Sequence, residues 1–527
     1  MSTSQPPKCY LLRIPRELRD AIYAYYLSDD GYYHQPESNT LRHADRSAID
    51  LALTLSCKQV AAEMIALPLK LNAVEFRTHL APIETAGIGE RKWLFRKPPP
   101  RDRHSDDYSA PPSRAGHFHF LLARLHDKEA DACVIAFNAY GTEELAKCIS
   151  ERFPQSCLGK QLQKLLPNKV TEASYYEVMD RFRNSTFYER QAMQFLLENI
   201  SAFATQANIV NESNHKSENE FKLPLGPMSR HASEVVASRI SSVEWPPWVL
   251  PTALHISKLH EIVNSVDKSD PEHGYCSNAH KLRYYESAAS QCIRFLGMLE
   301  QDASFRLRHL IIREDRRSCT KPRCHAYGLI PYLRGLPHLR VDHHVDMWHV
   351  IFTTDYSGLA RLGLDLRSWP DPRFIPWLSN AVDETATWIK EAMHLRRAGM
   401  PPSAYRLHLE APVETVEDVW GIIKSRAALH HLTSHLPVRN KYRSFRCDDD
   451  FVSCVRLILC GDSTVHLPCP IGTLEEFEEE IGRISEDLNS LPRNLWEDYG
   501  IDLVERALDT SMVDVKAIYE LYTDSPA

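Results

Sequence analysis

The sequence predicts an α+β protein that is rich in helix, with an N-terminal helical pair followed by a larger body of mixed helices and strands. Two observations support this prediction. Apolar residues recur at helical spacing through much of the 527-residue chain. From residue 301 onward, short alternating segments that end in charged turns interrupt that pattern. We divide the chain into an N-terminal segment (11–80), a Pro-rich basic loop or linker (91–114), a mainly helical region (115–300) and a region of alternating helices and strands (301–527).

Composition narrows the class of protein. The chain is 43% hydrophobic and 25% charged, which is typical of globular proteins. Its net charge of −8 argues against wholesale nucleic-acid binding. The thirteen cysteines follow no disulfide framework and no apolar leader follows Met1, so we expect reduced thiols and an intracellular protein of the cytoplasm or nucleus. The longest apolar runs are too short to span a bilayer, so we expect no membrane partner.

The first predicted helix begins after Ile14 and ends near Leu27. Pro15 suits its first turn, where the missing N–H group costs nothing. Ile14, Leu18 and Ile22 follow one another at four-residue spacing and form an apolar stripe. This stripe predicts a short amphipathic helix.

The rest of segment 11–80 is predicted from its turn-forming residues and from the spacing of its apolar residues. Ser28–Ser47 is polar and turn-rich, which predicts an exposed loop. A second helix is expected over Ala48–Leu67, ended by Pro68. Val74–Arg77 alternates as a short strand does.

Segment 11–80 contains the motifs Ile14-Pro15-x-Glu17-Leu18-Arg19-x-x-Ile22-Tyr23 and Ser56-Cys57-Lys58-Gln59-Val60-x-x-Glu63. Their order and spacing resemble the F-box-like domain that opens many uncharacterised proteins of filamentous fungi. F-box domains are small helical modules that dock onto the adaptor subunit of cullin-type ubiquitin ligases, while the rest of the chain recruits a target. The resemblance implies that the docking face is formed by Ile14, Pro15, Leu18 and Ile22. The alternative is that this stripe packs against the remainder of the chain as part of one core.

Region 301–527 is expected to alternate between strands and long helices. Leu307–Trp348 also resembles a second recurrent block of the same fungal proteins, a family without an assigned activity. The predicted strands are Leu307–Asp315, Ala404–Leu409 and Cys454–Asp462. The predicted helices are Phe374–Arg397, Val413–Thr433, Leu474–Leu488 and Leu495–Tyr522.

Residues with catalytic or metal-binding chemistry form no standard motif. Cys319, Cys324 and His325 are the nearest approach to a zinc site, but the gap between the cysteines exceeds the usual spacing. The chain has 19 glycines and no Gly-rich loop that could cradle a phosphate. We therefore expect no catalytic residue, no metal and no cofactor.

These observations predict a non-enzymatic protein-interaction protein, in its strongest form a substrate-recognition subunit of a cullin-type ubiquitin ligase. Its expected partners are the ligase adaptor and a target protein, with no nucleic acid. A scaffold protein in which segment 11–80 belongs to the core is the alternative. A zinc-stabilised domain or an enzyme built on the Cys319 cluster is the weakest of the three.

Overall fold

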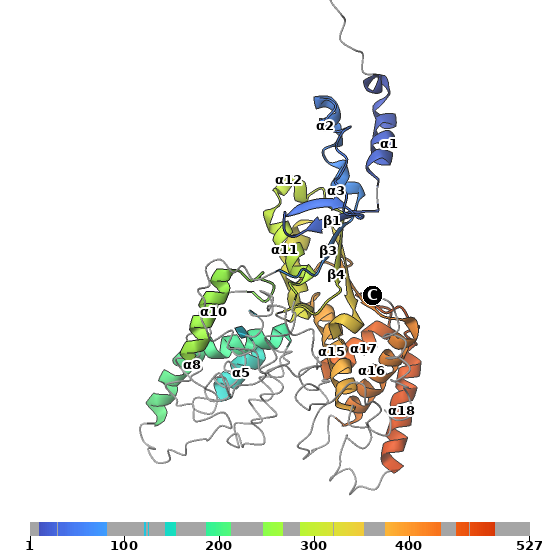
Figure 1. Ribbon diagram of the computed structural model, residues 1–527. Coiled ribbons are helices and arrows are strands. Elements are labelled where there is room, and N and C mark those ends of the chain that lie inside the picture. Colours follow the sequence, from blue (N-terminus) through green and yellow to red (C-terminus); the bar gives the residue numbers. More distant parts are fainter. Residues whose placement is uncertain are drawn as a thin grey trace, which may run out of the picture.

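The computed structural model describes residues 10–28, 30–81, 143–153, 186–211, 246–266, 285–319, 321–351, 375–433, 449–462 and 464–490, with single positions between 118 and 125. These residues combine helices with one seven-stranded mixed sheet, so the protein is of the α+β type. Figure 1 shows two helices near the N-terminus projecting from one end of the molecule, while most other helices gather at the opposite end.

The strands follow the order β2-β1-β3-β4-β5-β6-β7 across the sheet. All neighbours pair in parallel except β1 and β2, which form an antiparallel hairpin. From β3 onward the spatial order is therefore the order of the chain. The strands are β1 (Tyr32–Gln35), β2 (Thr40–His43), β3 (Val74–Arg77), β4 (His309–Glu314), β5 (Arg340–Asp346), β6 (Tyr405–Glu410) and β7 (Val465–His466).

Helices connect the parallel strands. Because crossovers between parallel strands are right-handed, a sheet with sequential strand order carries its connecting helices on one face. The helices are η1 (Leu11–Arg13), α1 (Arg16–Leu27), α2 (Lys58–Met64), α3 (Leu67–Leu71), α5 (Glu143–Arg152), α8 (Phe187–Asn211), α10 (Ala253–Val266), α11 (Ala288–Met298), α12 (Gln301–Ser304), η4 (Pro322–Leu329), α13 (Ile330–Gly335), η5 (Met347–Ile351), α15 (Ile375–His394), α16 (Val413–Thr433), α17 (Asp449–Leu459) and α18 (Leu474–Ser490).

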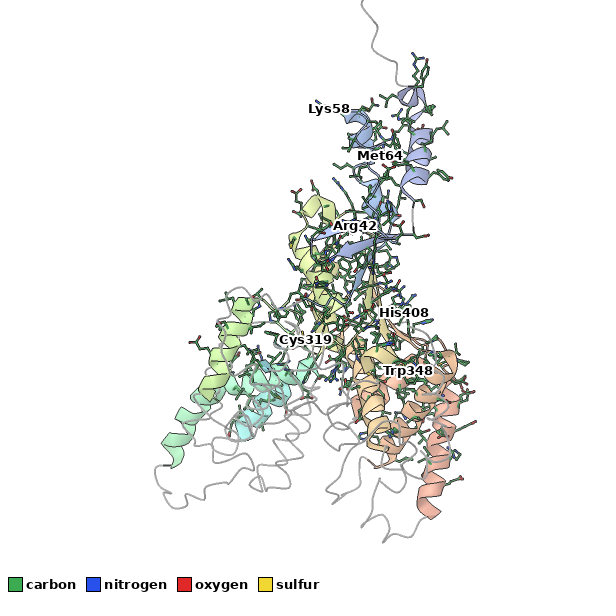
Figure 2. All side chains as sticks on the ribbon, viewed as in Figure 1. Arg42, Lys58, Met64, Cys319, Trp348 and His408 are labelled. Atoms are coloured by element: carbon green, nitrogen blue, oxygen red, sulfur yellow. The ribbon has the colours of Figure 1, made fainter. Side chains whose placement is uncertain are left out.

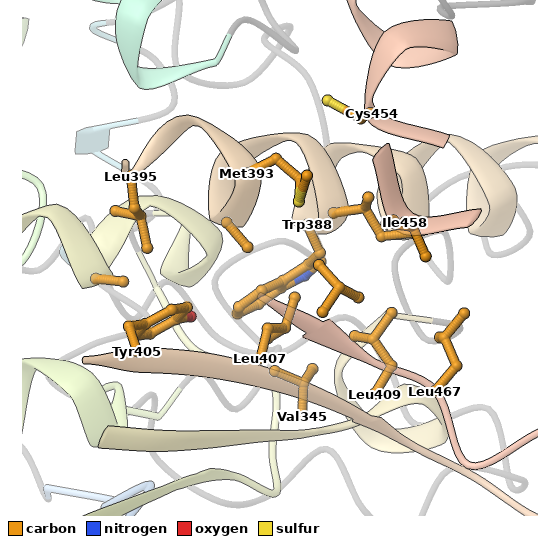
Figure 3. Packing of buried hydrophobic residues seen from close by; sticks show 14 of the residues in the cluster. Val345, Trp388, Met393, Leu395, Tyr405, Leu407, Leu409, Cys454, Ile458 and Leu467 are labelled. Carbon is orange, nitrogen blue, oxygen red and sulfur yellow. The ribbon is translucent and has the colours of Figure 1, made fainter. Parts of the chain in front are cut away.

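The main core lies between the sheet and these helices. Alternate residues of each long strand are buried, as expected where one face of a strand is covered. Helix α11 packs on β3 and β4, and α15 packs on β6 and β7. Figure 3 shows Tyr405, Leu407 and Leu409 of β6 beneath Trp388 and Met393 of α15. The other face of the sheet carries polar and charged side chains.

Several predicted elements are confirmed. The strands expected at Val74–Arg77, Leu307–Asp315 and Ala404–Leu409 correspond to β3, β4 and β6. The helices expected at Phe374–Arg397, Val413–Thr433 and Leu474–Leu488 correspond to α15, α16 and α18. The predicted linker 91–114 and the predicted helix Leu495–Tyr522 lie outside the described residues.

The predicted loop at Ser28–Ser47 is wrong, because this stretch contains the β1–β2 hairpin at the edge of the sheet. Gly31 allows the chain to pass from α1 into β1, since its φ of +107° favours glycine. A Cβ atom there would lie 3.2 Å from the carbonyl oxygen of Ala73. Both strands are short and lie between turn-forming residues, so the sequence pattern did not reveal them. Strand β1 is held in place by its pairing with β3.

The second predicted helix, Ala48–Leu67, is also too long. Helix α2 covers only Lys58–Met64 and begins where the Cys57 sulfur accepts a hydrogen bond from the Val60 N–H group at 3.5 Å. Pro68 does not end this helix; it lies in the first turn of α3, where proline is tolerated. The turns preceding Cys57 interrupt the helical spacing that the sequence suggested.

The third correction concerns Cys454–Asp462, which was predicted as a strand. Most of this stretch belongs to α17, which begins at Asp449. Phe451, Val455 and Ile458 are buried at three- and four-residue spacing, so the helical period prevails over the β-branched composition.

Candidate functional site

The N-terminal helical pair, defined as α1 and α2, has a small core of its own. Tyr23 and Leu27 of α1 are buried against Val60 and Met64 of α2, and no residue of the main core belongs to this cluster. Figure 2 shows α2, marked by Lys58 and Met64, beside α1 at the projecting end of the molecule. Helix α1 thus presents one face to α2 and leaves another face free.

A charged clamp joins the two helices. The guanidinium of Arg19 donates two hydrogen bonds to the carboxylate of Glu63, at 3.0 and 2.7 Å, and a third to the carbonyl oxygen of Ile14 at 2.6 Å. The Tyr23 hydroxyl donates to the same carboxylate at 2.8 Å. Such a fork-on-carboxylate arrangement is both strong and directional.

The clamp holds Glu63 in its ionised form. Hydrogen bonding by Arg19, supported by Tyr23 and Gln59, outweighs desolvation and lowers the pKa of Glu63 to about 2. Arg19 and Tyr23 belong to the first half of the sequence motif, and Glu63 belongs to the second. Apolar spacing alone does not predict this interaction, although a basic residue in one half of the motif and an acidic residue in the other were a signal for it.

The face of α1 opposite the clamp carries two of the residues predicted to dock. Leu18 is 56% exposed and Ile22 is 40% exposed, and Tyr25 continues the same stripe at 88%. Positions 18, 22 and 25 lie close together around a helix of 3.6 residues per turn. Pro15 is exposed as well, whereas Ile14 is half-buried. The predicted stripe is therefore the outer face of α1, and the inner face is formed by Arg19, Tyr23 and Leu27.

Exposed apolar side chains concentrate in segment 11–80 and at its border. Among the described residues, fourteen large apolar side chains are exposed, and nine of them lie between Tyr10 and Leu80. They include Leu55 at 78% and Ile65 at 60%, on either side of α2. Single exposed apolar residues are normal, so the candidate interaction surface is limited to those that share one helix face, Leu18, Ile22 and Tyr25.

The possible zinc cluster is closed and bonded within the core. Cys319, Cys324 and His325 are each 2% exposed or less. The Cys324 thiol donates to the carbonyl oxygen of Lys321 at 3.2 Å, and His325 Nδ1 lies 2.8 Å from the Ser287 hydroxyl. Desolvation raises the pKa of Cys324 to about 12, which favours the thiol over the thiolate that binds metals. Within the described part of the chain, no three histidine, cysteine or acidic residues are grouped as a metal site requires.

A second buried polar cluster surrounds Glu314 at the end of β4. Its Oε1 accepts hydrogen bonds from the Ser287 hydroxyl at 2.7 Å and the Ala289 N–H group at 3.0 Å, and its Oε2 accepts from Ser318 at 3.0 Å. Desolvation opposes ionisation, but His343 and these donors outweigh it and lower the pKa of Glu314. The carboxylate lies at the N-terminus of α11, where negative charge is favourable. Its contacts fix α11 to the sheet.

Comparison of the chain with protein-family models, curated proteins and solved structures found no significant match. In the part of the chain that the structure describes, no helix is both long and apolar enough to cross a bilayer.

Proposed function

We propose that this chain is a non-enzymatic protein-interaction protein that docks onto the adaptor subunit of a cullin-type ubiquitin ligase through the outer face of α1. In this proposal the N-terminal helical pair is F-box-like, and the body recruits the target protein. The single observation that carries the proposal is the exposure of Leu18 and Ile22 on a helix whose opposite face is occupied.

The contacts behind this face support a docking role. Arg19 and Tyr23 fix α1 to Glu63 of α2, so Leu18 and Ile22 are held at a defined orientation before any partner arrives. Preorganised apolar side chains bind with a smaller entropic cost than mobile ones. Two exposed aliphatic residues with Tyr25 beside them can form the apolar centre of an interface.

The second candidate is a scaffold protein that has no link to a ligase. It is favoured by the position of β3, which lies inside the sheet between β1 and β4 and pairs with both in parallel. The strands of segment 11–80 are thus part of the main architecture. The two candidates differ in what they assign to the outer face of α1, which is a specific docking site only in the first.

Co-purification of the full chain with the purified ligase adaptor tests the proposal. We expect wild type to retain the adaptor and the double variant Leu18→Asp/Ile22→Asp to lose it. The matched control is Leu254→Asp/Leu457→Asp, which places the same charges on exposed leucines of α10 and α17. If wild type and the Leu18→Asp/Ile22→Asp variant recover equally little adaptor, the ligase role is excluded and the scaffold candidate remains.

A further inference from the structure

Among the residues that the structure describes, the face of the sheet turned away from the helices is uncovered and mostly polar. Parallel sheets in α/β proteins are almost always covered on both faces and have apolar residues on each. Here Leu310, Ile312, Leu407 and Leu409 point to the helices, while the intervening positions are exposed or half-buried. We call the side chains of these intervening positions on β3–β7 the open face.

Basic residues form a straight row across the open face. The strand register pairs Arg77 with Arg313, Arg313 with His344, His344 with His408 and His408 with His466. Neighbouring strands lie about 4.8 Å apart, so the row extends for roughly 19 Å. The rings of His344 and His408 stack at 4.4 Å, and those of His408 and His466 lie 5.0 Å apart. Figure 2 shows His408 near the middle of the molecule, at the side of the sheet.

Three carboxylates are bound to this row. Glu75 contacts Arg77 at 2.6 Å and Arg313 at 3.1 Å. Asp342 lies between His309 at 2.8 Å and His408 at 3.1 Å. Glu410 contacts His344 at 2.6 Å and Arg313 at 3.6 Å. 

The remaining charged positions of the open face are Arg340, Arg406 and Asp346, and Asp346 also contacts His349 at 2.7 Å.

The charge of the open face depends on its histidines. Its four arginines balance its four carboxylates when His309, His344, His408 and His466 are neutral. Protonation of these four gives the face a net charge of +4. Burial, together with the charges of His344 and His466, outweighs the effect of Asp342 and lowers the pKa of His408. This histidine therefore gains its proton only below the ordinary histidine range.

We propose that the open face binds an extended acidic segment of a partner protein, and that binding strengthens as the pH falls and the histidines of the row become protonated. At neutral pH Glu75 and Glu410 compete with the partner for Arg77 and Arg313. Each proton that the row gains adds one positive charge to the open face, while the number of its carboxylates stays the same. This inference concerns the sheet and does not depend on adaptor docking by α1.

A protein segment fits the open face better than a nucleic acid does. The carboxylates of Glu75, Asp342 and Glu410 lie along both sides of the row and would repel a continuous phosphate backbone. A peptide can place separate carboxylates on the row and uncharged residues between them.

Titration of the full chain with a fluorescent oligoglutamate peptide tests this inference at about pH 7.5 and about pH 5.5, which lies below the ordinary histidine range while most glutamate side chains stay ionised. We expect on the order of tenfold tighter binding at the lower pH, from histidine protonation, and weaker binding as salt is added. An uncharged oligoglutamine peptide of equal length should not bind. The variant His344→Asn/His408→Asn/His466→Asn should lose most of the pH dependence, because it keeps one of the four histidines of the open face, His309.

Two further variants keep the experiment decisive. Arg77→Gln, on a 45% exposed side chain, should weaken binding at both pH values. Arg456→Gln, on α17 and paired with Glu478, removes the same charge from the helical side and should change nothing. Equal affinity at the two pH values would overturn the inference, as would an unchanged pH dependence in the triple histidine variant. Tighter binding of a single-stranded oligonucleotide through the same residues would overturn the class of partner.

Discussion

The N-terminal helical pair and the sheet body are held together by different forces, although segment 11–80 contributes to both. In the body, apolar side chains such as Phe76, Ile312 and Leu407 are completely buried between sheet and helices. In the pair, a few apolar residues are reinforced by the ion pair between Arg19 and Glu63. A region stabilised by burial loses most when volume is removed, whereas a region held by a charged clamp responds to charge and pH.

The largest expected effect is a cavity in the body. Phe76 is fully buried, with its ring centroid 5.3 Å from that of Phe295 and 5.0 Å from that of His34. We expect Phe76→Ala to lower the free energy of unfolding by about 3–5 kcal/mol, measured by urea denaturation of the full chain. Phe305→Ala, on a side chain that is 45% exposed, is the control. Equal losses in the two variants would contradict the burial assigned to β3.

Removal of the buried carboxylate at the end of β4 should come next. Glu314→Ala leaves the Ser287 and Ser318 hydroxyls and the Ala289 N–H group without their acceptor. We expect a loss of about 3 kcal/mol in the same denaturation experiment. Glu286→Ala removes a second buried carboxylate, one that accepts a hydrogen bond from Gln291 at 2.8 Å, and serves for comparison. A smaller loss for Glu314→Ala than for Glu286→Ala would disprove its role in fixing α11.

A smaller and local effect is expected at the clamp. Glu63→Gln replaces the carboxylate that Arg19 and Tyr23 share, so α1 and α2 should open more often. Hydrogen exchange should quicken over residues 16–27 and 58–64 and stay unchanged in the sheet. Glu17→Gln removes a charge from the exposed side of α1 and is the matched control. Protection lost equally across the sheet would show that pair and body open as one unit.

The clamp should also respond to acid. The pKa of Glu63 is lowered from 4.5 to about 2, so its ionised form stabilises the pair above pH 4.5. That contribution is lost as the pH falls from 4.5 towards 2, because the proton is bound more readily when the pair is open. The difference in exchange between wild type and Glu63→Gln should shrink over this interval. A constant difference would mean that the clamp does not control the titration of Glu63.

The sequence predicted those elements in which apolar residues recur at the regular spacing of a helix or a strand. Strand β3 and helices α15, α16 and α18 have regular apolar spacing, and their positions agree with the predictions. Strand β5 was not recognised as a strand because His343, a polar residue, occupies a fully buried position within it. The hairpin β1–β2 depends on contacts with β3, which local sequence does not reveal.

The outer and inner faces of α1 illustrate the same limit at the candidate site. The apolar stripe of Leu18 and Ile22 was visible as helical spacing, but spacing alone cannot tell whether a stripe faces a core or solvent. The orientation of α1 is set by Glu63, some 40 residues away, because it binds Arg19 and Tyr23 and so turns their face of the helix inward. The row of basic residues on the open face was invisible for a similar reason, because it is created by strand register.

The most direct test of the account is the unfolding of Leu18→Asp/Ile22→Asp, recorded on the same preparation that is used for adaptor binding. Both side chains are exposed, so we predict the cooperative thermal transition of wild type, with stability changed by no more than about 0.5 kcal/mol. Adaptor binding should be lost in that folded protein. Loss of the cooperative transition would contradict the account, because it would place Leu18 and Ile22 in the core.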